Sequence, residues 1–333
     1  PYNINQMYYR KKYGKGFTYK DEDGNTIKDK ILREWFESLV IPPAWENVEI
    51  SNKKSAKLLA TGRDEKGRKQ YIYHPKYRKK RNQEKFNRII RFAENLEHMR
   101  RVTGQYLRQR KMTREKVLST MVRLMDQAYF RPGSSKYTKR NNSYGLTTIR
   151  KKHLDIHDDA ITFSYTGKSG KPQERLIESK RLAKIIQQLD EIPGYRVFKY
   201  YDENNNKVEV ESSELNEFIH DIMGEDFSAK DFRTWAGTMI AAIALDVLGA
   251  VSKDDQNTLE KNVRNAIITV SEKLGNTPSV ARSSYIDPRV IENYTEGKTT
   301  SFFLKQVKNI LNKHENLSEQ ELSVLCMLKK NLE

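Results

Sequence analysis

The feature that most constrains the fold of this chain is a change in the period of its apolar residues near residue 84. Before this point apolar and polar residues alternate, as in Gln70-Tyr71-Ile72-Tyr73, and turn formers such as Asp23-Gly24-Asn25 separate the runs. After it, apolar residues recur at helical spacing over residues 86–96 and 117–128. Alternation is typical of strands, and the longer period is typical of helices. We therefore predict an α+β protein.

The charged segment 79–83 marks the expected boundary between two domains. We predict a small β-rich domain over residues 1–83 and a mainly helical domain over residues 84–333. Inside the second domain, residues 161–165 and 175–177 have the composition of strands. Between them lies the turn-forming sequence Gly167-Lys168-Ser169-Gly170. This pattern predicts a short antiparallel sheet with Lys168 at the tip of a hairpin.

Two capping boxes indicate where helices of the second domain begin. Ser228 stands three residues before Asp231, and Ser318 stands three residues before Glu321. We expect the first of these helices to cover residues 230–248 and to end at Gly249 in the left-handed conformation.

Two Pro residues give similar signals around a tyrosine. Thr277-Pro278 and Asp287-Pro288 each place an N-cap residue before a Pro at the first helical position. Tyr285 is therefore expected at the end of one short helix, just before the next.

The composition favours a polyanionic partner. The formal net charge is +17, and residues 1–83 hold 20 Lys+Arg against 10 Asp+Glu. Nucleic acid fits this charge better than a membrane does, because the longest apolar run, residues 239–245, is far too short to cross a bilayer. Cys326 is the only cysteine, so we expect a reducing compartment. The first residues lack an apolar signal segment, and we do not expect a secreted precursor.

Four segments of the second domain carry side chains suited to cleavage of a phosphodiester. Arginines can present paired donors to phosphate oxygens, a lysine can protonate a leaving oxygen, and a tyrosine hydroxyl can attack phosphorus. Singly, each is best explained as a surface charge or a packing aromatic, because the chain has 61 Lys+Arg and 18 Tyr. Their order and local context indicate one site; the segments are Phe130–Gly133 with Ser143–Thr148, Thr166–Lys171, Lys230–Gly237 and Gly275–Tyr285.

In these four segments the chain resembles type IB DNA topoisomerases of the bacterial and poxvirus kind. The resemblance implies that Tyr285 attacks a DNA phosphate and forms a 3′-phosphotyrosyl bond. It implies that Arg131 and Arg233 neutralise the phosphate, and that Lys168 is the general acid for the leaving 5′ oxygen. The implied activity is relaxation of supercoiled duplex DNA by strand cleavage, rotation and religation, without ATP, metal or another cofactor.

The chain departs from the poxvirus pattern at Asn276, where poxvirus and eukaryotic members have histidine and bacterial members often have asparagine. An asparagine can donate a neutral hydrogen bond to a phosphate oxygen, but it does not titrate. The resemblance therefore gives Asn276 a catalytic role that includes no acid–base chemistry.

The resemblance extends to the N-terminal domain, where residues 41–45 and 60–75 match the family's β domain. It implies that Gln70, Tyr71 and Tyr73 contact DNA, and that Lys230 contacts a phosphate. The alternative for the two tyrosines is that they only pack a strand. The expected partner is double-stranded DNA, enclosed by the two domains of a monomer, with no nucleotide cofactor and no membrane. The expected location is the cytoplasm, in association with the nucleoid, unless the protein is encoded by a large DNA virus.

Two rival functions stay open at this point. A tyrosine recombinase shares the Arg, Lys, Arg, Tyr set, although its N-terminal domain is usually helical and it usually has Gly-His-Ser where this chain has Gly275-Asn276-Thr277. A non-catalytic DNA-binding protein could also use the same scaffold. Two other motifs are rejected: Gly167-Lys168-Ser169 lacks the first glycine of a phosphate-binding loop, and His153 and His157 lie in a strand-like segment unsuited to a metal site.

Overall fold

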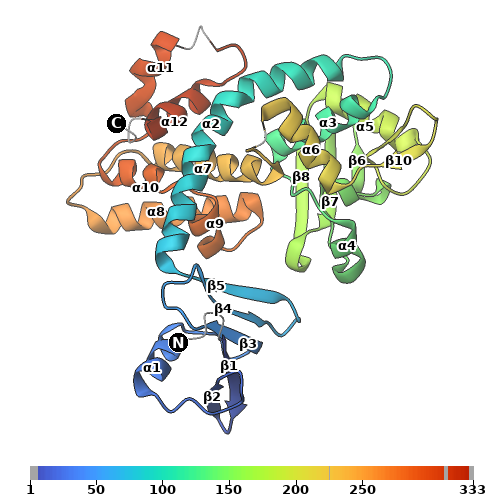
Figure 1. Cartoon of the computed structure of the whole chain (residues 1–333). Coiled ribbons are helices and arrows are strands. Elements are labelled where there is room, and N and C mark those ends of the chain that lie inside the picture. The colour runs from blue at the N-terminus through green and yellow to red at the C-terminus, as the bar shows by residue number, and fades with distance from the viewer. Residues whose placement is uncertain (1–6, 225, 311–313, 330–333) are drawn as a thin grey trace. The chain divides into compact units, whose positions relative to one another are not determined.

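The computed structural model describes residues 7–224, 226–310 and 314–329 (Figure 1). The chain divides into two units, one that extends to Lys85 and one that begins at Phe86. The predicted fold class is confirmed, because strands dominate the first unit and helices the second. No helix in the described ranges is long and apolar enough to cross a membrane.

The N-terminal unit is built on one antiparallel sheet with the strand order β2-β1-β3-β4-β5. A helix that the sequence pattern did not predict, α1 (Lys30–Ser38), packs against this sheet through Phe36, which is 1% exposed. The Phe36 ring lies 4.7 Å from the ring of Tyr19 and 5.1 Å from that of Tyr8. The strands are β1 (Met7–Tyr13), β2 (Gly16–Lys20), β3 (Glu46–Ser51), β4 (Leu58–Arg63) and β5 (Lys69–Tyr73).

The helix α2 (Pro75–Leu107) begins earlier than the sequence pattern indicates. The charged segment 79–83, where we expected the boundary between the domains, lies within this helix. Pro75 is the first helical residue, a position where its missing N–H costs nothing. The apolar residues from Phe86 onward then become the buried side of the same helix, so the change of period marks the start of burial rather than the start of the helix.

Helices form most of the second unit, and two small sheets lie among them (Figure 1). The further helices are α3 (Arg114–Ala128), α4 (Ser135–Asn141), α5 (Lys180–Glu191), α6 (Ser212–Met223), α7 (Ala229–Leu248), α8 (Gln256–Leu274), α9 (Pro278–Ser284), α10 (Pro288–Thr295), α11 (Leu304–Ile310) and α12 (Glu319–Lys329), with the 3₁₀ turns η1 (Leu146–Thr148), η2 (Lys151–His153), η3 (Lys168–Gly170) and η4 (Thr300–Phe303). The strands are β6 (Leu154–Ile156), β7 (Ala160–Thr166), β8 (Pro172–Glu178), β9 (Lys199–Tyr201) and β10 (Lys207–Glu209).

The predicted hairpin is present as β7 and β8, which pair antiparallel with Ile161 opposite Ile177. Strand β6 adds to the other edge of β7, so the sheet has the order β6-β7-β8. The turn η3 connects the two long strands, and Lys168 lies in it with an exposed side chain.

Helix α7 lies at the centre of the second unit and is buried along most of its length. Its predicted capping box is confirmed, because Asp231 accepts a hydrogen bond from the Ser228 backbone N–H at 2.9 Å. The prediction for Gly249 was wrong in part: its φ of +81° is positive, but its ψ of 160° lies outside the left-handed helical region. Both Pro-marked N-caps are present, with Thr277 accepting from Val280 and Asp287 accepting from Arg289.

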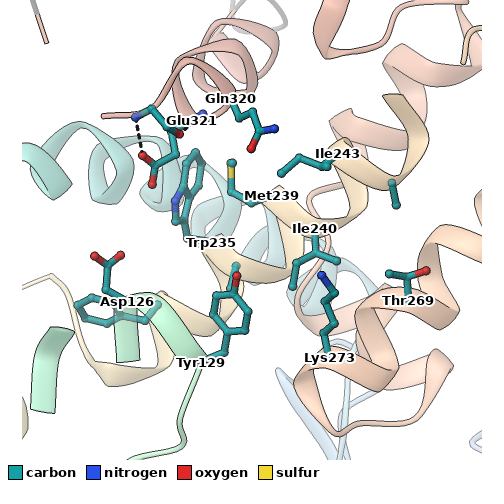
Figure 2. A pocket seen from close by; sticks show the side chains of 14 residues that line it. Asp126, Tyr129, Trp235, Met239, Ile240, Ile243, Thr269, Lys273, Gln320 and Glu321 are labelled. Carbon is teal, nitrogen blue, oxygen red and sulfur yellow. Dashed lines mark hydrogen bonds between the residues drawn. The ribbon is translucent and has the colours of Figure 1, made fainter. Parts of the chain in front are cut away.

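A pocket of about 360 Å³ lies on one side of α7 (Figure 2). Trp235, Met239 and Ile240 of α7 line it, together with Tyr129 after α3 and Lys273 of α8. By helical periodicity Trp235 and Met239 face away from Arg233 and Gly237.

Arg100 of α2 joins three helices near this pocket. Its guanidinium forms two hydrogen bonds to Asp126 of α3, both 2.9 Å long, and two to Glu321 of α12, at 2.7 and 2.8 Å. The side chains of Arg100, Asp126 and Glu321 are 15%, 7% and 12% exposed. Burial opposes ionisation of Glu321, but Arg100 outweighs it and lowers the pKa of this carboxyl.

We predict that Arg100→Met destabilises the protein by about 3–5 kcal/mol, because it leaves two buried carboxylates without their cation. Urea unfolding measures this loss, with Arg101→Met as the matched control, since Arg101 is exposed on the same helix. Because the folded pKa of Glu321 is depressed, its stabilising contribution is complete above its ordinary pKa of about 4.3 and is lost as the pH falls through the folded value. A stability gap between parent and variant that stays constant down to pH 2 would contradict this.

Candidate active site

Tyr285 is the C-cap residue of α9, and α7 fixes its backbone. Gly237 allows the two segments to touch: a Cβ on Gly237 would lie 2.7 Å from both the Cβ and the carbonyl oxygen of Tyr285. The next residue, Thr238, places its hydroxyl 3.2 Å from the Tyr285 carbonyl and accepts a hydrogen bond from the Asp287 N–H at 3.2 Å. The glycine in the predicted Lys230–Gly237 segment therefore serves close backbone packing.

Arg233 is the fifth residue of α7 and is 2% exposed. Its guanidinium donates hydrogen bonds to the carbonyls of Tyr129 at 2.6 Å and Leu274 at 2.7 Å. Tyr129 caps α3 in the left-handed conformation, with φ of +61°, and this turn of the backbone presents its carbonyl to Arg233. The Arg233 Cζ atom lies 5.2 Å from the centre of the Tyr285 ring.

Arg131 follows α3 in a loop that a close backbone contact holds in place. A Cβ on Gly145 would lie 2.5 Å from the Cα of Gly133, and the Leu146 N–H donates to the Arg131 carbonyl at 2.8 Å. The Arg131 guanidinium reaches the turn after α8, where it donates to Asn276 Oδ1 at 2.5 Å and to the Gly275 carbonyl at 3.2 Å. Arg131 and Asn276 thus meet although they lie far apart in the sequence.

Two buried donors at this site have no hydrogen-bond partner in the described part of the chain. They are the Nδ2 of Asn276 and the Nε of Arg233. A buried donor without a partner costs about 1–3 kcal/mol, and a bound anion would remove this cost by supplying an acceptor. Because Oδ1 of Asn276 is already bound by Arg131, its amide nitrogen is the group that can bind an anion.

A pocket of about 420 Å³ collects most of the predicted catalytic side chains. Arg131, Arg233 and Tyr285 form its inner part, and the exposed Lys168 and Lys230 also line it. Asn276 reaches the same place through its bond to Arg131. Of the other lining residues, Pro132, Gly133, Ser143 and Tyr144 belong to the predicted segments. Ser134 and Tyr137 do not, and the sequence analysis did not single them out.

The cations of the pocket change the ionisation of its tyrosine. Burial raises the pKa of the Tyr285 hydroxyl, but the charges of Arg233, Arg131 and Lys230 outweigh burial and lower the pKa below its ordinary value. Burial also lowers the pKa of Arg233, and the charge of Arg131 lowers it further. The site therefore favours both an ionised tyrosine and an added anion.

Gln70, Tyr71 and Tyr73 belong to the N-terminal unit, and they divide between two faces of strand β5. Tyr71 and Tyr73 are 48% and 39% exposed and stack at 6.0 Å between ring centres. Gln70 lies on the other face of the strand, and its amide nitrogen donates a hydrogen bond to Asp64 Oδ2 at 2.8 Å. The same carboxylate forms an ion pair with Arg68, and the hydrogen bond from the Arg68 side chain is the main cause that lowers the pKa of Asp64 to about 2.

Sequence reasoning missed two polar residues on β8, Gln173 and Arg175. They lie on the same face of the strand as Ile177, which is 3% exposed, and their side chains are half-buried. The alternation of residues 173–177 carries this signal, because a strand that buries Ile177 also turns Gln173 and Arg175 inward. The Nε of Arg175 is a third buried donor that has no partner among the residues described.

We predict that the Tyr285 hydroxyl titrates below the ordinary tyrosine pKa of about 10. Removing one neighbouring cation by Arg131→Gln should raise this pKa. Carbon-13 NMR of protein labelled at tyrosine Cζ measures it, and Tyr285→Phe assigns the signal. Arg282→Gln is the matched control, because Arg282 is an exposed cation on α9 and is not among the main causes of the Tyr285 pKa shift. An equal pKa in the parent and in Arg131→Gln would refute this description of the site.

Comparison with known proteins places this geometry in a family. The model of the catalytic core of eukaryotic DNA topoisomerase I matches residues 74–314, and that of the N-terminal domain of bacterial DNA topoisomerase IB matches residues 16–64. The DNA topoisomerase 1B of Acanthamoeba polyphaga mimivirus is 32% identical over 295 residues, which cover 86% of this chain and 87% of the viral protein. The DNA topoisomerase 1B of vaccinia virus (strain Copenhagen) is 23% identical over 264 residues, 79% of each protein.

These matches agree with the resemblance carried by the four segments around the pocket. The catalytic-core match begins at the last residues of the N-terminal unit and extends to residue 314, so it includes every residue that lines the pocket. Because that match covers well over half of the sequence, the chain belongs to the type IB DNA topoisomerase family.

Proposed function

We propose that this protein relaxes supercoiled duplex DNA by cutting and resealing one strand through Tyr285. The observation that supports this most directly is the position of the Tyr285 ring beside the buried Arg233 in a pocket also lined by Arg131, Lys168 and Lys230. A tyrosine with a lowered pKa, surrounded by fixed cations, is suited to attack a phosphodiester.

The first step is binding of the scissile phosphate. Arg131 and Arg233 lie at the inner end of the pocket and place positive charge against the two non-bridging oxygens. The Nδ2 of Asn276 donates a neutral hydrogen bond to one of these oxygens. Because these donors are held by backbone carbonyls and by each other before the substrate arrives, little reorganisation accompanies the reaction.

The second step is transfer of the phosphoryl group to the tyrosine. Tyr285, whose lowered pKa lets it release its hydroxyl proton to water, forms a bond from its oxygen to phosphorus, while the bond from phosphorus to the 5′ oxygen breaks. Lys168 gives its proton to the leaving 5′ oxygen, and the products are a 3′-phosphotyrosyl bond and a free 5′ hydroxyl. The exposed position of Lys168 on the hairpin turn allows it to approach the DNA from the pocket rim.

Resealing is the reverse of the transfer step and follows rotation of the broken strand, driven by the torque in the DNA. The 5′ hydroxyl gives its proton back to Lys168 and its oxygen attacks phosphorus, and the bond from phosphorus to Tyr285 breaks. Since the phosphotyrosyl bond conserves the energy of the phosphodiester, no ATP is needed. The side-chain cations neutralise the phosphate, so we also propose that no divalent ion is needed.

Duplex DNA is the substrate that the charge of the chain favours. The net charge of +17 and the exposed, stacked Tyr71 and Tyr73 suit binding to a sugar–phosphate backbone. Lys230, beside the pocket, supplies a further phosphate contact. We propose that the protein acts on one duplex as a monomer. Its substrate would be the DNA of a cell or of a large DNA virus.

We expect the parent protein to relax negatively supercoiled plasmid in EDTA without ATP, as seen on agarose gels. Tyr285→Phe should bind DNA normally but should not relax it, because the nucleophile is absent. Lys168→Ala should relax it about 10²- to 10⁴-fold more slowly, because the general acid is absent. The exposed Lys253→Ala, outside the pocket, is the control. Bound DNA without relaxation by the parent would favour the non-catalytic alternative.

The asparagine at position 276 gives a separate prediction about pH. Asn276→Ala should slow single-turnover cleavage by about 10²- to 10³-fold, the usual loss for one fixed donor. Asn276→His should introduce an inflection near pH 6.5, roughly the ordinary pKa of histidine, that the parent lacks. Cleavage rates of the three proteins from pH 5 to 9 measure both effects. A parental inflection near pH 6.5 that disappears in Asn276→Ala would contradict the role given to Asn276.

A further inference from the structure

The side chain of Gln173 lies between two glycines that directly precede residues of the proposed site. A Cβ on Gly167, the residue before Lys168, would lie 2.7 Å from Gln173 Cγ. A Cβ on Gly275, the residue before Asn276, would lie 2.6 Å from Gln173 Oε1 and 2.7 Å from Nε2. Gln173 therefore connects the turn that carries Lys168 to the turn that carries Asn276.

The two turns differ in how firmly the rest of the unit holds them. The turn at Gly275 ends α8 through two backbone hydrogen bonds, from the Gly275 N–H to Glu272 and from the Asn276 N–H to Ser271 at 2.8 Å. The carbonyl of Leu274, just before this turn, accepts a hydrogen bond from the Arg233 guanidinium. This turn is thus part of the helical core.

The turn of the hairpin is held much less firmly. Lys168, Ser169 and Gly170 are all exposed. The Gly167 N–H donates to the Lys171 carbonyl at 2.7 Å, a bond that closes the hairpin upon itself. Among the described residues, the end of the hairpin is linked to the rest of the unit by a hydrogen bond from the Tyr144 N–H to the Thr166 carbonyl at 2.7 Å. It is also linked by the packing of Gln173 against Gly275 and by a 3.4 Å contact from Lys171 Nζ to the Asn276 carbonyl.

The amide of Gln173 is itself fixed in orientation. Its Oε1 accepts a hydrogen bond from Arg175 Nη2 at 2.7 Å, and its Nε2 donates to the Pro172 carbonyl at 2.8 Å. Arg175 is two residues further along β8 on the same face. Burial lowers the pKa of Arg131, and the charge of Arg175 lowers it further, so Arg175 acts within range of the phosphate site.

We propose that Gln173, oriented by Arg175, is a positioning residue that holds Lys168 in place for protonation of the leaving oxygen. This inference rests on the proposed function of Lys168. Gln173 touches no reacting atom in this account; it acts by keeping the hairpin turn against the Gly275 turn. Lys168 then reaches the pocket from a fixed direction rather than from a mobile loop.

The test compares two DNA duplexes that differ in one atom of the scissile phosphodiester. In the first the 5′ bridging atom is oxygen, and in the second it is sulfur. The tyrosine forms its bond to phosphorus in both, and either the phosphorus–oxygen or the phosphorus–sulfur bond breaks. A thiolate leaves without a proton, because a thiol has a pKa of about 8.5. The sulfur duplex therefore removes the need for Lys168 and leaves every other requirement unchanged.

We expect Gln173→Ala to slow single-turnover cleavage of the oxygen duplex by about 10- to 100-fold, the cost of a misplaced catalytic group. On the sulfur duplex the same variant should cleave within about threefold of the parent, as Lys168→Ala should, because neither needs the acid there. In the double variant Gln173→Ala/Lys168→Ala, the two losses on oxygen should not add, since both remove the same contribution. Glu174→Ala, on the exposed face of β8, is the matched control and should cleave both duplexes at the parental rate.

Gly167→Ala disturbs the contact between Gly167 and Gln173 from the side of the glycine. It is the second test variant, to be used if Gln173→Ala does not fold. Its backbone φ of −90° accepts alanine, but the added methyl meets Gln173 Cγ. It should show the same loss on oxygen and the same recovery on sulfur.

An equal loss on both duplexes, or no loss on oxygen, would overturn the inference while leaving the proposed function intact. Failure of the parent to cleave either duplex would overturn both. Thermal unfolding of each variant confirms that the rates compare folded proteins.

Discussion

The burial of the Arg233 guanidinium between two backbone carbonyls is the constraint on which the rest of the site depends. Those carbonyls come from Tyr129, at the end of α3, and Leu274, at the end of α8. The two carbonyls pair the Nη1 and Nη2 donors of a cation that would be costly to bury without acceptors, so the ends of both helices must stay where they are. The loop after Tyr129 then carries Arg131, and the turn after Leu274 carries Asn276. One buried side chain in this way sets the position of two others.

The same arrangement brings the positive charges of Arg131 and Arg233 together, and a bound phosphate offsets the repulsion between them. Burial and mutual repulsion both lower the pKa of Arg233, which shows that the folded protein holds its guanidinium against an unfavourable field. The backbone of Tyr285 is held by close contact with Gly237. The positive charges that repel Arg233 stabilise the ionised form of Tyr285, because its oxygen is then negative. Binding a phosphate anion relieves the repulsion between the arginines. The site is therefore less stable without an anion and is complementary to a negatively charged substrate.

Much of this could be predicted from local signals in the sequence. The Lys168 hairpin, the Ser228 capping box and the Thr277-Pro278 cap are set by neighbouring residues, and the structure shows all three. Contacts between distant segments could not be predicted in this way. The left-handed conformation of Tyr129 is one example, because it is uncommon for a residue other than glycine. The packing of Gln173 against Gly275 is another, and α1 was missed because its nine residues lie among strands.

The most direct test of the central claim is to identify the residue that becomes bonded to DNA. The protein is mixed with a nicked duplex that lets the short strand downstream of the cut diffuse away, denatured in detergent and digested with trypsin. Mass spectrometry of the DNA-linked peptides then locates the bond. The account predicts a single modified peptide in which Tyr285 carries the 3′ phosphate of the DNA. A DNA bond at another tyrosine, or at a 5′ phosphate, would contradict it.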